Sequence, residues 1–225
     1  MRALLLIADI GGYTRFMKLH RLSVAHAQEN TNRLLEALVD AAPRLEVVDV
    51  EGDSAFLSVS EPRDDEVAGA LAGVAATMHR GFHERRQRME QNLCPCDACA
   101  QLGSLTVKFV AHIGDVVRQE VARRTTLAGL DVILVHRMLK NSVPIREYVL
   151  MTEPVLRRVP SEVQDQAAAV EEELEGIGTE RLYYVSLEQI AGELPLPARI
   201  GVAGRLGDTV GLAMRGLPRM VGLKR

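Results

Sequence analysis

The sequence has no apolar run near the roughly 20 residues that a membrane-spanning helix requires, so we expect no transmembrane segment. Its formal net charge is −3, which excludes a protein that coats nucleic acid through an overall basic surface. It also lacks internal repeats and low-complexity segments. What is present is a chain of 225 residues, 47% hydrophobic and 25% charged, which is long enough for one sizeable core.

Cysteine is scarce as well. All three cysteines, Cys94, Cys96 and Cys99, lie in the stretch CPCDAC. They are too few for a disulfide framework, which favours a reducing, cytoplasmic environment. The start MRALLLIADI has a very short apolar run and no small-residue cleavage site, so we expect a strand there and not a signal peptide.

The order of hydrophobic patterns predicts strands that alternate with helices. Consecutive apolar residues at 2–10 indicate a strand buried on both faces. Leucines at helical spacing after Ser23 indicate a helix that ends at Pro43, and 45–60 is typical of two short strands around the turn EGD. Asp64 begins a long helix whose later turns, HERRQRMEQ, are expected to project into solvent.

The second half continues the alternation. It has two strands joined near Gly114, a helix from about Leu130 to Lys140, a strand at EYVLM, a short helix, and two strands around EGIG. This order favours an α/β sandwich in which a mixed sheet carries helices on one face.

The last segment, 189–225, is rich in glycine and arginine, and we expect it to follow a domain that spans 1–188. Its apolar residues at helical spacing predict one apolar helix face, made of Leu206, Val210, Met214 and Leu217. One interpretation is a terminal helix that docks on its own domain. The other is a basic amphipathic tail that touches a membrane surface or a partner.

The stretch LLLIADIGGYTRF ends a buried strand on Asp9 and continues with Gly11 and Gly12. In one interpretation Asp9 caps the helix that begins near Tyr13. In the other, Asp9 holds a metal ion and the glycines let backbone N–H groups approach a phosphate. Asp53, in the turn EGD, adds a second carboxylate. If the strands are adjacent, the two carboxylates repel unless a hard divalent cation such as Mg²⁺ joins them.

Four motifs extend this pattern: IADIGGYTRF, VDVEGDSAFL, FVAHIGDVV and AGLDVILVHRML. In order and spacing they resemble the class III nucleotidyl cyclase catalytic domain, over roughly residues 1–186. Together with CPCDAC and HRMLKN, they are similar to a bacterial family of cyclase-fold proteins of unknown function, DUF2652. The resemblance implies an α/β sandwich with a ferredoxin-like core, in which helices pack on a mixed sheet.

The resemblance also implies a site for a nucleoside triphosphate, ATP or GTP, and two divalent ions, Mg²⁺ or Mn²⁺. Asp9, Asp53 and the Ile10 carbonyl would bind the metals, and Arg137 would neutralise charge that develops on the phosphate. The turn that would hold the triphosphate consists of Gly11, Gly12, Tyr13 and Thr14. Because such sites form between two protomers, a homodimer is implied, and the product would be a cyclic nucleotide, cAMP or cGMP.

Several positions depart from the cyclase pattern. Ile133 replaces an asparagine that orients the ribose, and Glu175 and Ile177 stand in place of lysines that meet the triphosphate. Asp49 and Thr126 occupy the base-reading positions, and the carboxylate of Asp49 favours guanine. The metal-binding half of the implied site is retained, whereas the half that stabilises the transition state is altered.

The cysteine cluster has two interpretations. Three thiolates this close suit a soft ion such as Zn²⁺, with a fourth ligand from His79, His83, His112 or a partner chain. Alternatively, the three residues are reduced, half-buried thiols in a loop.

Three functions therefore remain open. In the first, the chain is an active nucleotidyl cyclase, a phosphorus–oxygen lyase in which other groups replace the missing asparagine and lysines. Alternatively, it is a degenerate domain of the same fold that binds or senses a nucleotide. The third hypothesis is a scaffold that zinc stabilises.

Overall fold

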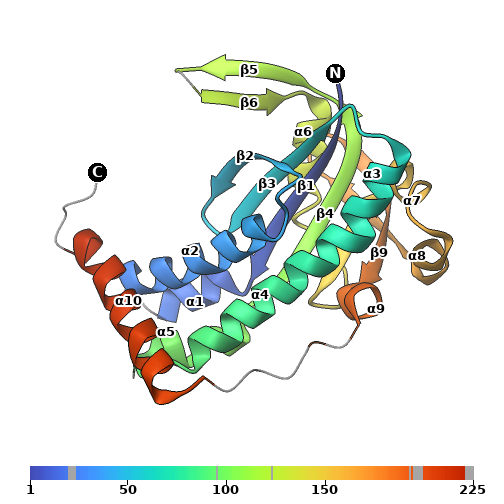
Figure 1. Ribbon diagram of the computed structural model, residues 1–225. Helices are drawn as coiled ribbons and strands as arrows, with labels where there is room; N and C mark the ends of the chain where they lie inside the picture. The colour runs from blue at the N-terminus through green and yellow to red at the C-terminus, as the bar shows by residue number, and fades with distance from the viewer. Residues whose placement is uncertain (20–23, 95, 123, 193, 195–199, 221–225) are drawn as a thin grey trace.

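A seven-stranded mixed sheet forms the centre of the molecule (Figure 1). The computed structural model describes residues 1–19, 24–94, 96–122, 124–192, 194 and 200–220. The strand order is β2-β3-β1-β4-β7-β9-β8. The strands are β1 (Arg2–Gly11), β2 (Glu46–Glu51), β3 (Ser54–Ser60), β4 (Thr106–Asp115), β7 (Tyr148–Thr152), β8 (Ala168–Leu174) and β9 (Gly178–Ser186).

Strand β1 lies near the middle of this sheet because its side chains are apolar on both faces. It pairs antiparallel with β3 on one side and with β4 on the other. Leu4 and Leu6 point into one core, and Leu5 and Ile7 into the other. The expected buried strand at 2–10 is thus present. The β4–β7 pair is parallel, which makes the sheet mixed.

Helices cover both faces of the sheet, whereas the sequence predicted helices on one face. The larger core packs β1 against α2 (Val24–Asp40) and α4 (Ala75–Glu90), through residues such as Leu34 and Phe82. The second core packs the opposite face against α6 (Leu130–Arg137) through Leu134 and Val135. Figure 1 shows α2 and α4 side by side in front of the strands.

The predicted long helix from Asp64 is present as three consecutive segments, α3 (Asp64–Gly69), a π-helical turn (Ala70–Val74) and α4. The expectation that its last turns lie in solvent holds in part: Glu84, Arg88 and Glu90 are exposed, whereas His83 and Met89 are buried.

The strand predicted after Gly114 leaves the main sheet. Residues of β5 (Val117–Val121) pair only with β6 (Arg124–Ala128) in a two-stranded sheet. Figure 1 shows this hairpin projecting from one end of the molecule. The described side chains of β5 are exposed, so the alternation that marks a strand in the sequence does not here mark a strand of the core.

Short helices connect the strands. They are α1 (Tyr13–Leu19), α5 (Asp97–Ala100), the 3₁₀ turn Leu102–Ser104, α7 (Glu153–Leu156), α8 (Ser161–Gln166) and α9 (Leu187–Ala191). A longer helix, α10 (Val202–Met220), follows. Within the described part of the chain, no helix is both long and apolar enough to cross a membrane.

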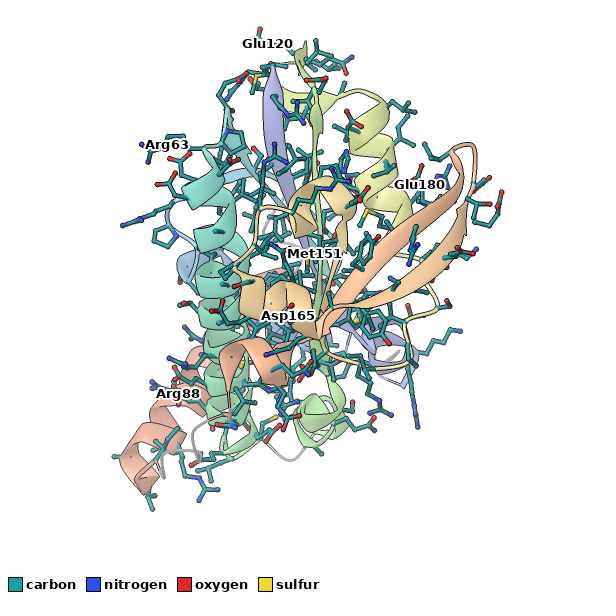
Figure 2. All side chains as sticks on the ribbon, turned by 90° about the vertical axis from the view of Figure 1, so that its right-hand side faces the viewer. Arg63, Arg88, Glu120, Met151, Asp165 and Glu180 are labelled. Atoms are coloured by element: carbon teal, nitrogen blue, oxygen red, sulfur yellow. The ribbon has the colours of Figure 1, made fainter. Side chains whose placement is uncertain are left out.

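Helix α10 lies beside the ends of α2 and α4, at the opposite end of the molecule from the β5–β6 hairpin (Figure 1). Arg88, labelled in Figure 2, forms an ion pair of 2.9 Å with Asp208. Arg205 also donates to the Gln91 carbonyl at 2.6 Å. The predicted apolar residues Leu206 and Val210 are exposed, and the side chains of Met214 and Leu217 lie outside the described residues. Two polar contacts thus join α10 to the end of α4.

A partly buried carboxylate joins α4 to the start of β4 and β7. Glu147 accepts hydrogen bonds from His79 Nε2 at 3.1 Å, from His83 Nε2 at 2.9 Å and from the Val107 N–H at 3.0 Å. Burial alone would raise the pKa of Glu147, but these donors outweigh burial and hold that pKa well below its ordinary value. The ionised carboxylate is therefore part of the native fold.

We predict that Glu147→Ala lowers the free energy of unfolding by about 2–3 kcal/mol, because it leaves two buried histidines without their acceptor. Urea unfolding at about pH 7 measures the loss, and the control Glu153→Ala, which breaks an exposed pair with Arg157, should cost at most about 0.5 kcal/mol.

The cost of Glu147→Ala should also depend on pH. Because the pKa of Glu147 is lower in the folded protein than its ordinary value of 4.5, the ionised carboxylate stabilises the fold above about pH 4.5, and this stabilisation is lost as the pH falls below that value. The difference between wild type and Glu147→Ala should therefore shrink at about pH 3. A difference that stays constant or grows would contradict the account of Glu147.

Candidate functional site

The sheet register brings the two predicted metal-binding carboxylates together. Asp9, at the end of β1, pairs with Ser54 of β3, and Asp53 is the turn residue just before that strand. The Ile10 N–H donates to the Asp53 carbonyl at 3.0 Å, which holds the turn against β1. Burial, followed by the charge of Asp9, raises the pKa of Asp53 to about 6. Two carboxylates that disfavour each other's ionisation create a local preference for a cation.

One cation is already present beside them, and the sequence analysis missed it. Lys108 of β4 stands opposite Asp9 in the register, with its Nζ 3.5 Å from Asp9 Oδ2. The same ammonium donates to the Leu139 carbonyl at 2.8 Å. Burial raises the pKa of Asp9, and Lys108 partly offsets this effect. In the sequence, Lys108 could have been noticed as the one lysine within the mainly apolar strand TVKFVAH.

The turn after Asp9 requires its two glycines. A Cβ on Gly11 would clash with Oγ1 of Thr106 on the neighbouring strand. Gly12 has φ +86°, a conformation that L side chains rarely adopt. Tyr13 then begins α1, and its hydroxyl donates to Gln28 Oε1 at 2.9 Å. The turn is thus fixed both to the sheet and to α2.

A hollow of about 320 Å³ opens beside this turn. Gly11 and Gly12 line it, and the charged side chains among its described lining residues are all basic: Arg15, Lys108 and Arg146. Sequence reasoning did not select either arginine: Arg15 lies within the motif IADIGGYTRF but was given no role there, and Arg146 lies outside the four motifs. A concave surface with three cations and an open glycine backbone suits a polyanion.

A second hollow, of about 630 Å³, has both Asp9 and Arg137 in its walls. Arg137 forms an ion pair of 2.7 Å with Glu175, from the turn between β8 and β9. Both side chains are largely exposed. Ile133, one turn earlier on α6, is exposed and has no hydrogen-bonding group. The predicted phosphate-neutralising arginine therefore faces a carboxylate of its own chain.

The two predicted base-reading residues line one small pocket of about 250 Å³. Asp49 contributes from β2 and Thr126 from β6. Asp49 Oδ1 accepts from the Val50 N–H at 2.8 Å. Phe56 and His136 complete one wall, with their rings edge to face at a centroid distance of 5.1 Å. A small pocket with aromatic and polar lining residues suits a nucleobase, although its role stays a prediction.

A histidine that the sequence did not point to, His26, lies beside the cysteine cluster. One donor atom from each of His26, Cys94, Cys96 and Cys99 lies within 4.8 Å of the others. The three histidines suggested as a fourth ligand lie elsewhere: His79 and His83 contact Glu147, and His112 contacts Thr152 and Asp131.

His26 precedes the cysteines by about seventy residues, so no local spacing indicated it. Burial raises the pKa of Cys99 to about 12, although a hydrogen bond from Asn92 acts in the opposite direction. A thiolate at Cys99 therefore needs a nearby cation.

Solved structures that superpose on this chain include nucleotidyl cyclases. The guanylyl cyclase Cya2 superposes with a TM-score of 0.64 at 16% identity, covering 82% of this chain and 91% of that one. The adenylyl cyclase CyaB from P. aeruginosa superposes with a TM-score of 0.59 at 14% identity, covering 89% of this chain and 97% of that one. The guanylate cyclase domain of RhGC from Catenaria anguillulae, in complex with GTP, superposes with a TM-score of 0.56 at 14% identity. This match covers 82% of this chain and 96% of that one. At these identities the similarity shows the fold, which confirms the predicted fold class.

Sequence comparison identifies the family. The chain is 34% identical over 194 residues to the uncharacterized protein Rv2561/Rv2562 of Mycobacterium tuberculosis, covering 86% of this chain and 90% of that protein. A family model described as a protein of unknown function, DUF2652, matches residues 31–148. Because this match spans more than half of the chain, the protein belongs to the DUF2652 family, on a class III nucleotidyl cyclase fold.

Proposed function

We propose that the protein binds a nucleoside triphosphate together with divalent metal ions at the end of β1. The observation that carries the proposal is the contrast between two adjacent surfaces. Asp9 and Asp53 form an acidic pair, and the neighbouring hollow beside Gly11 and Gly12 is lined by basic side chains. Metal-bound triphosphate is a ligand that needs both: carboxylates for the cations and positive groups for the phosphate oxygens.

In this proposal each residue has a separate task. Asp9, Asp53 and the Ile10 carbonyl hold Mg²⁺ or Mn²⁺, and the ions supply charge that draws the phosphates to the site. A metal held by Asp9 would compete with Lys108 for that carboxylate, and Lys108, which also lines the hollow, would then be available to the phosphates. Arg15 and Arg146 supply the positive charge that the cyclase lysines supply elsewhere in the fold.

The base would enter the slot between Asp49 and Thr126. A carboxylate accepts hydrogen bonds from the N1–H and N2 amine of guanine, and adenine offers no matching pair of donors. GTP is therefore the proposed ligand in preference to ATP. Class III sites combine two protomers, so the proposal includes a homodimer in which the base slot of one chain faces the metal site of its partner.

Cyclisation of the bound nucleotide is a second candidate, and the retained Arg137 favours it. The 3′-hydroxyl would attack the α-phosphate and pyrophosphate would leave, with the arginine neutralising the new charge. Two observations weigh against a fast reaction. Arg137 is paired with Glu175, and Ile133 offers no hydrogen bond to a ribose. Loss of one such stabilising group costs on the order of 10²–10³-fold in rate, so binding without rapid turnover is our primary proposal.

We predict that Asp53→Asn weakens Mn²⁺-dependent GTP binding by about tenfold or more, because a neutral amide replaces a metal-binding carboxylate. Calorimetry with and without Mn²⁺ measures the effect. The fold should be unharmed, since the change removes repulsion from Asp9. Asp65→Asn, at an exposed position of α3, is the matched control and should bind as wild type. Equal affinity of wild type and Asp53→Asn would refute the metal assignment.

We predict that Arg15→Ala/Arg146→Ala loses about tenfold in GTP affinity and much less in guanosine affinity, because both guanidinium groups line the phosphate hollow. Arg157→Ala/Arg63→Ala removes two other exposed arginines and serves as the control. If the two double variants lose GTP affinity equally, the effect is one of net charge and the hollow is not the phosphate site.

We predict that the wild-type protein with GTP or ATP and Mn²⁺ yields no cyclic monophosphate by mass spectrometry above the Asp9→Ala background, while GTP raises its melting temperature. A cyclic product that disappears in Asp9→Ala would replace the primary proposal by the cyclase. Absence of both product and thermal shift would contradict nucleotide binding altogether.

A further inference from the structure

We propose that His26, Cys94, Cys96 and Cys99 form a closed zinc site that fastens helix α2 to the segment between α4 and β4. This site is separate from the proposed nucleotide site and does not depend on it. His26 lies 68 to 73 positions before the three cysteines along the chain, and only the fold brings it to them.

The geometry fits one tetrahedral ion. Zinc–sulfur bonds of about 2.3 Å and zinc–nitrogen bonds of about 2.0 Å set the ligand atoms about 3.5–3.8 Å apart at the corners of a tetrahedron. Here the four donor atoms all lie within 4.8 Å of one another, and Cys96 Sγ is 3.3 Å from His26 Nδ1. A small inward adjustment of side chains that are already gathered completes the site.

The neighbours of the cluster suit thiolate ligands. The Asn92 side-chain amide donates to Cys99 Sγ at 3.4 Å, and the amide of the buried Asn30 approaches the same sulfur at 3.8 Å. Amide N–H donors around a ligating sulfur orient it and stabilise its negative charge. Cys99 itself is almost fully buried, at 5% exposure. A reduced thiol that served only to pack would not need two amide donors.

The donor set selects the metal and the type of site. Three sulfurs and one imidazole favour Zn²⁺ over the hard ions Mg²⁺ and Mn²⁺. Four protein ligands fill the tetrahedron, which leaves no position for a substrate, so the role is structural. The other group of potential ligands, His79, His83 and Glu147, differs because its carboxylate already accepts three hydrogen bonds.

The site has a structural consequence near the turn at Gly12. His26 and Gln28 lie two residues apart on α2, and Gln28 accepts the hydroxyl of Tyr13, the first residue of α1. Helix α5, which carries Cys99, contacts both α1 and α2. Zinc would therefore tie α2 to α5, which also contacts α1, and its removal should loosen the packing of all three.

The test begins with the full-length protein purified under reducing conditions, with zinc measured by mass spectrometry of the elements. We expect about one zinc per chain. Titration of the thiols with a mercurial should release this zinc as all three cysteines react, a readout that requires no variant to fold. A chelator should lower the melting temperature. Zinc-free protein whose three thiols react freely in the native state overturns the proposal.

Variants distinguish the cysteine cluster from the group of His79, His83 and Glu147. Cys96→Ser and His26→Gln should each lose the zinc, whereas His83→Gln, which alters the histidine pair beside Glu147, should retain it. Replacement of zinc by Co²⁺ should give the visible bands of tetrahedral cobalt and a thiolate-to-cobalt charge-transfer band in the wild type. Loss of zinc in His83→Gln with retention in Cys96→Ser, or a cobalt spectrum without thiolate bands, overturns the assignment.

Discussion

The antiparallel pairing of β1 with β3 and β4 is the constraint on which the candidate site depends. The register sets Asp9 beside Ser54 on one side and beside Lys108 on the other, and the Ile10 N–H ties the Asp53 turn to the same strand end. A slip of one residue would turn Asp9 to the opposite face, into the core that α2 and α4 cover. Because β1 is apolar on both faces, its leucines can be buried on either one, and Asp9 is the residue whose charge disfavours such a slip.

Electrostatics then divides the site into a retained and an altered half. The retained half has two crowded carboxylates, a turn that only glycine fits well, and a basic hollow. In the altered half, an arginine is neutralised by Glu175 and an isoleucine stands where a ribose-binding amide is expected. Binding needs the first half, whereas fast cyclisation needs both, which is why metal-dependent nucleotide binding is the function we propose.

Much of this arrangement could be predicted from the sequence, and the exceptions have physical reasons. Consecutive apolar residues predicted β1, and the EGD turn predicted the hairpin, so Asp9 and Asp53 were expected to meet. Long-range partners carry no local signal: His26 reaches the cysteines, and Glu147 the two histidines, only through tertiary packing. The β5–β6 hairpin and the position of α6 were missed because periodicity shows that a face is apolar and does not show which surface covers it.

The most direct test of the central claim is electron paramagnetic resonance of Mn²⁺ in the presence of GTP and the protein, compared between wild type and Asp9→Asn. Free, GTP-bound and protein-bound Mn²⁺ give different signals, so the difference between the two proteins measures the ions held by the carboxylate pair without requiring any reaction. Our account predicts Mn²⁺ bound in a protein–nucleotide complex by the wild type and largely lost in Asp9→Asn. Equal Mn²⁺ binding by the two proteins would contradict it.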